Sequence, residues 1–252
     1  MACLGEVTAG IAHEIQNRLN FVNNFSEVNV DLGNELKEEV RKLSLTAEQS
    51  QNLHSLADEL LMNHEKIVHH GKRAGAIVRN MLQHTRKSNG VKEPTNINSL
   101  VDECLKLSYN GFRSKNQAFA SKIETQFDEE VSQVNVMPQD LSHVLMNLMN
   151  NAFYAVNEKK KQLNGIFEPT VLVSTKKTGN KIIISVNDNG TGMSEKVTAK
   201  VFQPFFTTKP NGEGTGLGLS LSYDVVTKGH GGEIRVESKE GEGAKFTIQL
   251  PA

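Results

Sequence analysis

Apolar residues recur at helical spacing through the first third of the chain. From Leu4 to about Met81 there is no proline, and the apolar positions step by three or four residues. The first stripe comprises Leu4, Val7, Ile11, Ile15, Leu19, Val22, Phe25, Leu32, Leu36, Val40 and Leu43. The second comprises Leu53, Ala57, Leu60, His64, Ile67, Gly71, Ala74, Val78 and Met81, in steps that form a heptad repeat. Between the stripes, Thr46 followed by Gln49 is a capping-box signature for a new helix. The pattern predicts two long antiparallel helices joined by a turn near residues 43–46.

Two apolar stripes are more than a single hairpin can bury well. A pair of such hairpins would cover both stripes in a four-helix bundle, which predicts a homodimer. The alternative is that the hairpin packs on the rest of its own chain.

A polar segment that ends in Gly90 and Pro94 separates the hairpin from a chain of different pattern. We predict a helical hairpin domain over residues 1–86, a linker over 87–95 and a second domain over 96–252. Within the second domain the pattern predicts helices at 98–109, 141–156 and 217–228, the second of them opened by Pro138. It predicts strands at 120–127, 131–136, 170–175, 181–186, 232–238 and 244–250. Because strands and helices do not alternate strictly, we expect an α+β sandwich.

Charge and composition exclude several classes of protein. Lys and Arg total 28 and Asp and Glu total 29, a net charge of −1, so the chain has no basic field to attract nucleic acid. No apolar run approaches the roughly 20 residues of a membrane span, and the N-terminus lacks the pattern of a signal peptide. We therefore expect a segment without membrane contact in a cytoplasmic protein, with Cys3 and Cys104 as reduced thiols.

Two stretches of the second domain place polar groups where a ligand could use them. Asn147 and Asn151 are four residues apart and share one face of a predicted helix, where their amide oxygens would suit a Mg²⁺ ion already held by phosphates. The alternative is a pair of hydrogen-bonded core asparagines. Asp188 ends a predicted strand and is followed by Gly190 and Gly192, so a carboxylate could accept a hydrogen bond from an exocyclic amine beside a closely approaching backbone. Taken alone, this second stretch is an ordinary Asp/Gly turn.

Two further stretches follow at short intervals. Three phenylalanines lie within residues 201–209, and the segment 194–215 is long for a connection, as lids often are. Residues 212–219 are rich in glycine and run directly into a predicted helix, where free N–H groups and the helix dipole can bind phosphate. This glycine-rich stretch matches neither the P-loop nor the dinucleotide fingerprint.

In this order and spacing, the four stretches resemble the N, G1, F and G2 boxes of the histidine-kinase ATP-binding domain. That fold is shared with type II topoisomerases and heat-shock chaperone ATPases, and the resemblance covers about residues 94–251. It implies ATP as substrate, Asn151 as a Mg²⁺ ligand with Asn147 beside it, and Asp188 as the acceptor of the adenine amine. The other ATP-binding residues that it implies are Tyr154, Gly190, Gly192, Lys209, Gly214, Thr215, Gly216, Leu217, Gly218 and Thr247. Some relatives carry a lysine where Tyr154 stands.

The hairpin carries a fifth resemblance, because residues 10–20 (Gly-Ile-Ala-His-Glu-Ile-Gln-Asn-Arg-Leu-Asn) are similar to the H box of histidine kinases. His13 is two residues from the apolar positions on either side, about 200° around the helix, so it is predicted to face solvent with Asn17 on the same face. The resemblance implies His13 as phosphoacceptor, Glu14 as general base and Asn17 as an aid to phosphatase activity. The alternative is that His13 and Asn17 are ordinary exposed residues. Arg18 departs from the family, which usually has proline there.

These resemblances predict the catalytic core of a sensor histidine kinase. It would phosphorylate itself on His13 with Mg·ATP and pass the phosphoryl group to an aspartate on a separate response-regulator receiver domain. The alternatives are a dimeric signalling scaffold with a dead kinase domain, and an ATPase of the same fold without phosphotransfer. Because Met1 directly precedes the H box, we also expect the chain to be a fragment that has lost its sensor region, with a natural sensorless protein as the alternative.

Overall fold

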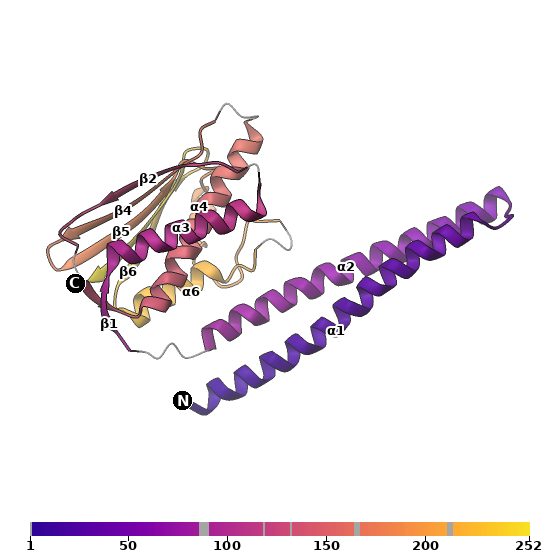
Figure 1. Cartoon of the computed structure of the whole chain (residues 1–252), viewed down its shortest axis with the longest axis horizontal. Helices are drawn as coiled ribbons and strands as arrows, with labels where there is room; N and C mark the ends of the chain where they lie inside the picture. The colour runs from indigo at the N-terminus through magenta and orange to yellow at the C-terminus, as the bar shows by residue number, and fades with distance from the viewer. Residues whose placement is uncertain (1, 86–90, 118, 132, 164–166, 211–213) are drawn as a thin grey trace. The chain divides into compact units, whose positions relative to one another are not determined.

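The computed structural model describes residues 2–85, 91–117, 119–131, 133–163, 167–210 and 214–252. The chain divides into two compact units, one built on a helical hairpin and one built on a sheet with helices (Figure 1). Among the described residues, no helix is both long and apolar enough to cross a membrane.

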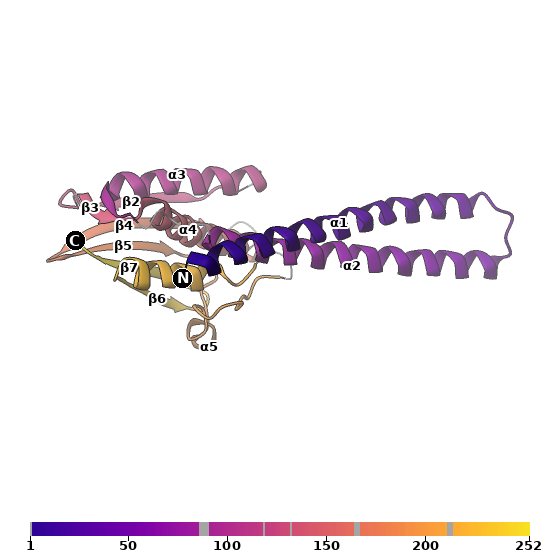
Figure 2. The same ribbon diagram turned by 90° about the horizontal axis from the view of Figure 1, so that it is seen from below.

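The hairpin consists of α1 (Ala2–Arg41) and α2 (Ala47–Thr85), which run antiparallel (Figure 2). The predicted capping box lies at the start of α2. The Thr46 N–H donates to Gln49 Oε1 at 3.1 Å, and the Gln49 N–H donates to Thr46 Oγ1 at 3.2 Å. Both the predicted hairpin and its turn are therefore confirmed.

The contact between α1 and α2 buries small and polar side chains together with Val40 and Ala57, two members of the predicted stripes. Asn23 and Ser26 of α1 and Gly71 of α2 are buried, and a Cβ on Gly71 would lie only 1.9 Å from Asn23 Oδ1. Several members of the predicted stripes point elsewhere: Phe25 is 68% exposed and Leu60 is 55% exposed. Several large apolar side chains of the stripes therefore lie outside the contact between the two helices.

The second unit contains a five-stranded sheet in the order β2-β4-β5-β7-β6, in which only β2 and β4 pair in parallel. Its strands are β2 (Lys122–Phe127), β4 (Thr170–Thr178), β5 (Lys181–Asp188), β6 (Glu233–Lys239) and β7 (Gly243–Pro251). A separate two-stranded ladder pairs β1 (Glu93–Asn96) with β3 (Gln133–Val136). Because β1 begins at Glu93, the predicted linker 87–95 is too long at its C-terminal end.

Helices cover one face of the five-stranded sheet (Figures 1 and 2). They are α3 (Ile97–Lys115), α4 (Pro138–Gln162) and α6 (Gly218–Asp224), and α6 continues into a π-helical turn η1 (Val225–Gly229). A one-turn helix, α5 (Glu195–Thr198), follows β5. Pro138 occupies the first turn of α4, as the sequence predicts. The core forms between the helices and alternate residues of the central strands, with Ile184 and Ile248 packed among side chains such as Leu145 and Phe153. The predicted α+β sandwich is confirmed.

The predicted helix 217–228 ends differently from its expected form, because a buried histidine closes it. His230 Nε2 accepts a hydrogen bond from the Met137 N–H at 3.0 Å, so Nδ1 carries the ring proton and donates to the Val225 carbonyl oxygen at 2.9 Å. His230 thus ties the end of η1 to the residue that precedes α4.

Candidate functional site

Asp188, the last residue of β5, is a carboxylate buried in the core. Only 5% of it is exposed, and it pairs in register with Val171 of β4 and Ala244 of β7. Burial raises the pKa of Asp188 to about 6, although the N–H groups of Gly190 and Ala244 and the charge of Lys159 act in the opposite direction. The Gly190 N–H donates to Asp188 Oδ1 at 2.8 Å. A strongly perturbed carboxylate at a strand end is a candidate acceptor for a ligand's donor group.

The turn after Asp188 needs glycine at two positions. A Cβ on Gly190 would lie 2.6 Å from the Ala155 carbonyl carbon in α4. Gly192 has φ +62°, and a Cβ there would lie 2.0 Å from the Lys239 carbonyl oxygen at the end of β6. Close packing therefore explains why the sequence has Asp-x-Gly-x-Gly at this turn.

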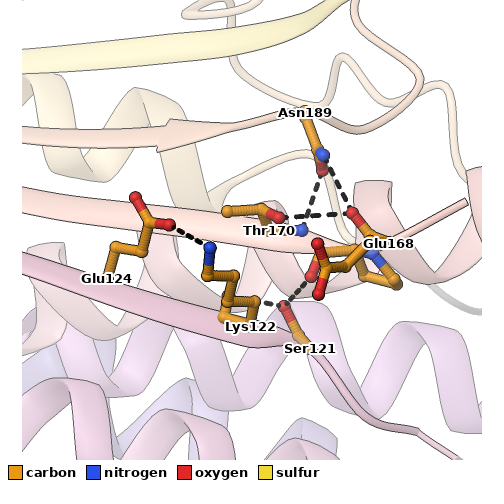
Figure 3. Close-up of polar contacts among 7 residues, drawn as sticks. Ser121, Lys122, Glu124, Glu168, Thr170 and Asn189 are labelled. Atoms are coloured by element: carbon orange, nitrogen blue, oxygen red, sulfur yellow. Dashed lines mark hydrogen bonds and ion pairs between the residues drawn. The ribbon is translucent and has the colours of Figure 1, made fainter.

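Asn189, between Asp188 and Gly190, fastens the same turn to the start of β4. Its Nδ2 donates to the Glu168 carbonyl oxygen at 3.0 Å, and its Oδ1 accepts from the Thr170 N–H at 2.9 Å (Figure 3). Ser121 joins this cluster by donating to the Pro169 carbonyl oxygen at 3.1 Å. Asn189 is not among the predicted site residues, because an asparagine within a turn gives no distinct signal in the sequence.

Asn147 and Asn151 lie on one face of α4, as the sequence predicts, but Asn147 has a packing role. Its Nδ2 donates to Ser222 Oγ in α6 at 3.0 Å, and a Cβ on Gly218 would lie 2.4 Å from its Oδ1. The Asn147 amide nitrogen is used where α6 contacts α4, and the role of Asn147 as a metal ligand beside Asn151 stays a prediction.

Asn151 lies between the two glycine-rich segments of the site. Positions 147, 151 and 155 are each four residues apart, so they follow one face of α4. At one end of this row Asn147 contacts Gly218, and at the other Ala155 contacts Gly190. The partly buried Asn151 therefore lies one turn from each contact. Tyr154, also partly buried, is in the next turn of the same helix.

The face of the sheet on which Thr247 lies follows from the register between β5 and β7, and its contact with adenine stays a prediction. Thr247 pairs in register with Ser185 of β5, and successive residues of a strand point to opposite faces. Thr247 and Asp188 are therefore on opposite faces of the sheet. The β7 residue that lies beside Asp188 is Ala244, which the sequence analysis did not select.

The remaining predicted residues lie at the start of α6, in the segment before it and in the hairpin. Gly216, with φ +69°, would place a Cβ 2.3 Å from the carbonyl carbon of Phe205, and Leu217 directly precedes α6. For Lys209, Gly214 and Thr215, an approach to the site stays a prediction.

In the hairpin, Asn17 is exposed and lies four residues after His13 in α1. The side chains of His13 and Glu14 lie outside those that the structure describes.

The site geometry agrees with a known protein family. The model of the family "Histidine kinase-, DNA gyrase B-, and HSP90-like ATPase" matches residues 137–252, the segment that carries α4, Asp188 and both glycine-rich turns. Four of the predicted sequence boxes lie within this matched segment, and the hairpin lies outside it.

The whole chain, and not only the matched segment, is similar to sensor histidine kinases. It is 29% identical over 252 residues to the signal transduction histidine-protein kinase AtoS of Escherichia coli K12, a match that covers 100% of this chain and 35% of AtoS. The catalytic domain of histidine kinase ThkA aligns with 29% identity and a TM-score of 0.52, over 64% of this chain and 95% of that domain. ThkA in complex with the response regulator protein TrrA shares the fold over 99% of this chain and 62% of ThkA, with 24% identity and a TM-score of 0.56. The chain spans less than half the length of the first curated relatives it matches.

Proposed function

We propose that this chain is the catalytic core of a sensor histidine kinase. In this proposal the ATPase domain binds Mg·ATP, His13 accepts the γ-phosphoryl group, and an aspartate of a separate response-regulator receiver domain receives it next. The observation that carries the proposal is the row along α4, which places Asn151 between Gly218 and the turn that follows the buried Asp188. The similarity of the whole chain to AtoS supports extending the proposal to the hairpin.

In the proposed nucleotide site Asp188 binds the base. Its carboxylate accepts the hydrogen bond of the adenine amine, and Gly190 and Gly192 let the flat base lie against the backbone. Water is largely excluded from this carboxylate, which strengthens a hydrogen bond to it.

Asn151 would hold Mg²⁺ in this site. An asparagine offers one neutral oxygen, which suits a hard cation whose other ligands are phosphate oxygens and water. When bound, Mg²⁺ would neutralise part of the charge on the phosphates. Among the described residues no cluster of three or more His, Cys, Asp or Glu could hold a metal ion. Tyr154, Lys209 and the segment Gly214 to Gly218 are the proposed phosphate contacts.

Phosphoryl transfer is proposed to use two neighbouring residues of α1. One ring nitrogen of His13 attacks the γ-phosphorus, the bond to the β–γ bridging oxygen breaks, and ADP leaves. Glu14 takes the proton from the other ring nitrogen. Asn17, one turn along the same face, orients a water molecule toward the regulator's aspartyl phosphate and so supports phosphatase activity. We place these reactions in the cytoplasm, where ATP and receiver domains meet.

We also propose that the hairpin forms a homodimer. Its exposed apolar residues include Phe21, Val22, Phe25, Val28, Leu32 and Leu36 in α1 and Leu53, Leu56, Leu60 and Ile67 in α2. The contact within the hairpin buries Asn23, Ser26, Val40, Ala57 and Gly71, so the larger exposed side chains are available to a second copy.

The test is labelling of the purified chain with γ-phosphate-labelled ATP. We expect acid-labile label on the wild type, none on His13→Gln, and wild-type label on the matched control His69→Gln. ATP affinity should be the same in all three proteins. ATP binding without label would indicate the dead scaffold, and ATP hydrolysis without label would indicate an ATPase.

With a phosphorylated regulator added, Asn17→Ala should slow dephosphorylation of the regulator and leave labelling of His13 intact.

A further inference from the structure

Lys159 extends the row of α4 residues that faces the site. It follows Asn151 and Ala155 at the same four-residue interval, one turn beyond the contact between Ala155 and Gly190. Its Nζ donates to the carbonyl oxygens of Asn189 and Gly241, both at 2.7 Å. The same ammonium lies 4.7 Å from the centroid of the Phe167 ring. Lys159 therefore joins three segments that are far apart in sequence.

The two carbonyl groups that Lys159 binds belong to turns that are already attached to each other. The Gly241 N–H, in the turn between β6 and β7, donates to the Thr191 carbonyl oxygen at 2.7 Å. Ser238 Oγ accepts from the Met193 N–H at 2.9 Å and donates to the Gly243 carbonyl oxygen at 2.8 Å. Lys159 adds a charged donor that fastens both turns to α4.

The three lysines at 159–161 differ in what they contact. Lys161 forms an ion pair with Glu158 at 2.6 Å, and its side chain is 64% exposed. Exposed pairs of this kind contribute little to stability. Lys159 instead reaches the turn that carries the ligand-binding carboxylate.

We propose that Lys159 is a positioning residue of the nucleotide site, one that holds the turn 189–192 where Asp188 and Gly190 can meet adenine. This inference rests on the proposed function, because it assumes that Asp188 binds the base. The positive charge of Lys159 also favours the charged form of Asp188, since it lowers the pKa that burial raises.

The test compares the affinity of the full chain for ATP and for GTP, which has a carbonyl where adenine has its amine. In Lys159→Met we expect the Kd for ATP to rise by about tenfold while that for GTP changes little, so the preference for ATP falls. Lys159→Arg can still donate to both carbonyl groups and should keep most of the preference. Lys161→Met is the matched control and should bind like the wild type. Thermal unfolding without nucleotide establishes that each variant is folded.

Four results would overturn the inference, and they separate a failure of Lys159 from a failure of the proposed site. If Asp188→Asn loses its preference for ATP but folded Lys159→Met keeps it, Lys159 does not position the site and the proposed function stands. Lys159 also does not position the site if Lys159→Met and Lys159→Arg lose the preference for ATP equally. The same conclusion follows if Lys159→Met binds ATP and GTP more weakly by the same factor. In both cases the proposed function stands. If Asp188→Asn binds both nucleotides like the wild type, the proposed adenine site is wrong and the inference fails with it.

Discussion

At the scale of single residues, Asp188 combines a stability cost with a proposed function. Its pKa in the folded chain is about 6, above the ordinary value of 3.8. The charged form is therefore disfavoured by folding, and this cost is present above pH 6 and disappears as the pH falls toward 3.8. Nucleotide binding can explain why the chain has a residue that lowers the stability of the nucleotide-free fold at neutral pH.

We predict that Asp188→Asn raises the stability of the nucleotide-free chain while it weakens ATP binding. At pH 8 the free energy of unfolding should rise by up to about 3 kcal/mol, because no charge is buried, and the gain should shrink below pH 6. Denaturant unfolding at several pH values measures this. The contrasting control is Asp128→Asn. The N–H groups of Lys177 and Glu130 hold the pKa of Asp128 below its ordinary value, so its neutralisation should lower stability at pH 8. A loss of stability in both variants would contradict the prediction.

Which residues surround Asp188 could be predicted only in part. Gly190 and Gly192 carry a local signal, because few other residues fit a tight turn beside a strand end. The face of the sheet on which Thr247 lies depends on the register between β5 and β7, which the sequence does not contain. Lys159 was missed because three consecutive lysines at a helix end look like a solvated surface, and only the fold brings one of them to the carbonyl of Asn189.

At the scale of elements, local signals predicted most helices and strands. The capping box at Thr46 and Gln49 and the proline at 138 act within one turn, so they mark helix starts directly. The strand β1 was missed because it contains Pro94 within a polar segment, and its only partner, β3, lies about 40 residues later in the sequence. The contact between α1 and α2 was also hard to place, since the largest apolar residues lie outside it.

The turn at Gly190 packs closely against α4. A Cβ on Gly190 would lie 2.6 Å from the backbone of Ala155 and 2.7 Å from Asp188 Oδ1, so Gly190→Ala must displace the turn from the helix. We expect a loss of about 1–3 kcal/mol in unfolding free energy and a Kd for ATP at least about tenfold higher. Gly111→Ala is the matched control in α3. It has open space around it and should gain up to about 1 kcal/mol with unchanged ATP binding. Wild-type ATP affinity in Gly190→Ala would show that the turn does not contact the base.

At the scale of the whole molecule, the hairpin exposes an apolar stripe that a second copy could cover. Leu32 is 54% exposed and Phe25 is 68% exposed, and both lie on one side of α1 by the 100° step of the helix. The exposed Asn20 and Asn34 lie on the opposite side. A dimer that covers the stripe would bury charges placed at the first pair of positions, while charges at the second pair would stay in water.

We therefore predict that the chain has twice the 27.8 kDa of one copy in light scattering at micromolar concentration. Phe25→Glu combined with Leu32→Glu should give a monomer whose ATPase domain still binds ATP, because the substitutions bury charge only in the dimer. Asn20→Glu combined with Asn34→Glu adds the same charge and should remain a dimer. A monomeric wild type, or equal masses for the two double variants, would mean that the stripe is not covered by a second copy. The helical content measured by circular dichroism separates loss of the dimer from unfolding of the hairpin. If the hairpin needs its partner to fold, Phe25→Glu combined with Leu32→Glu would lose helix and the other double variant would not.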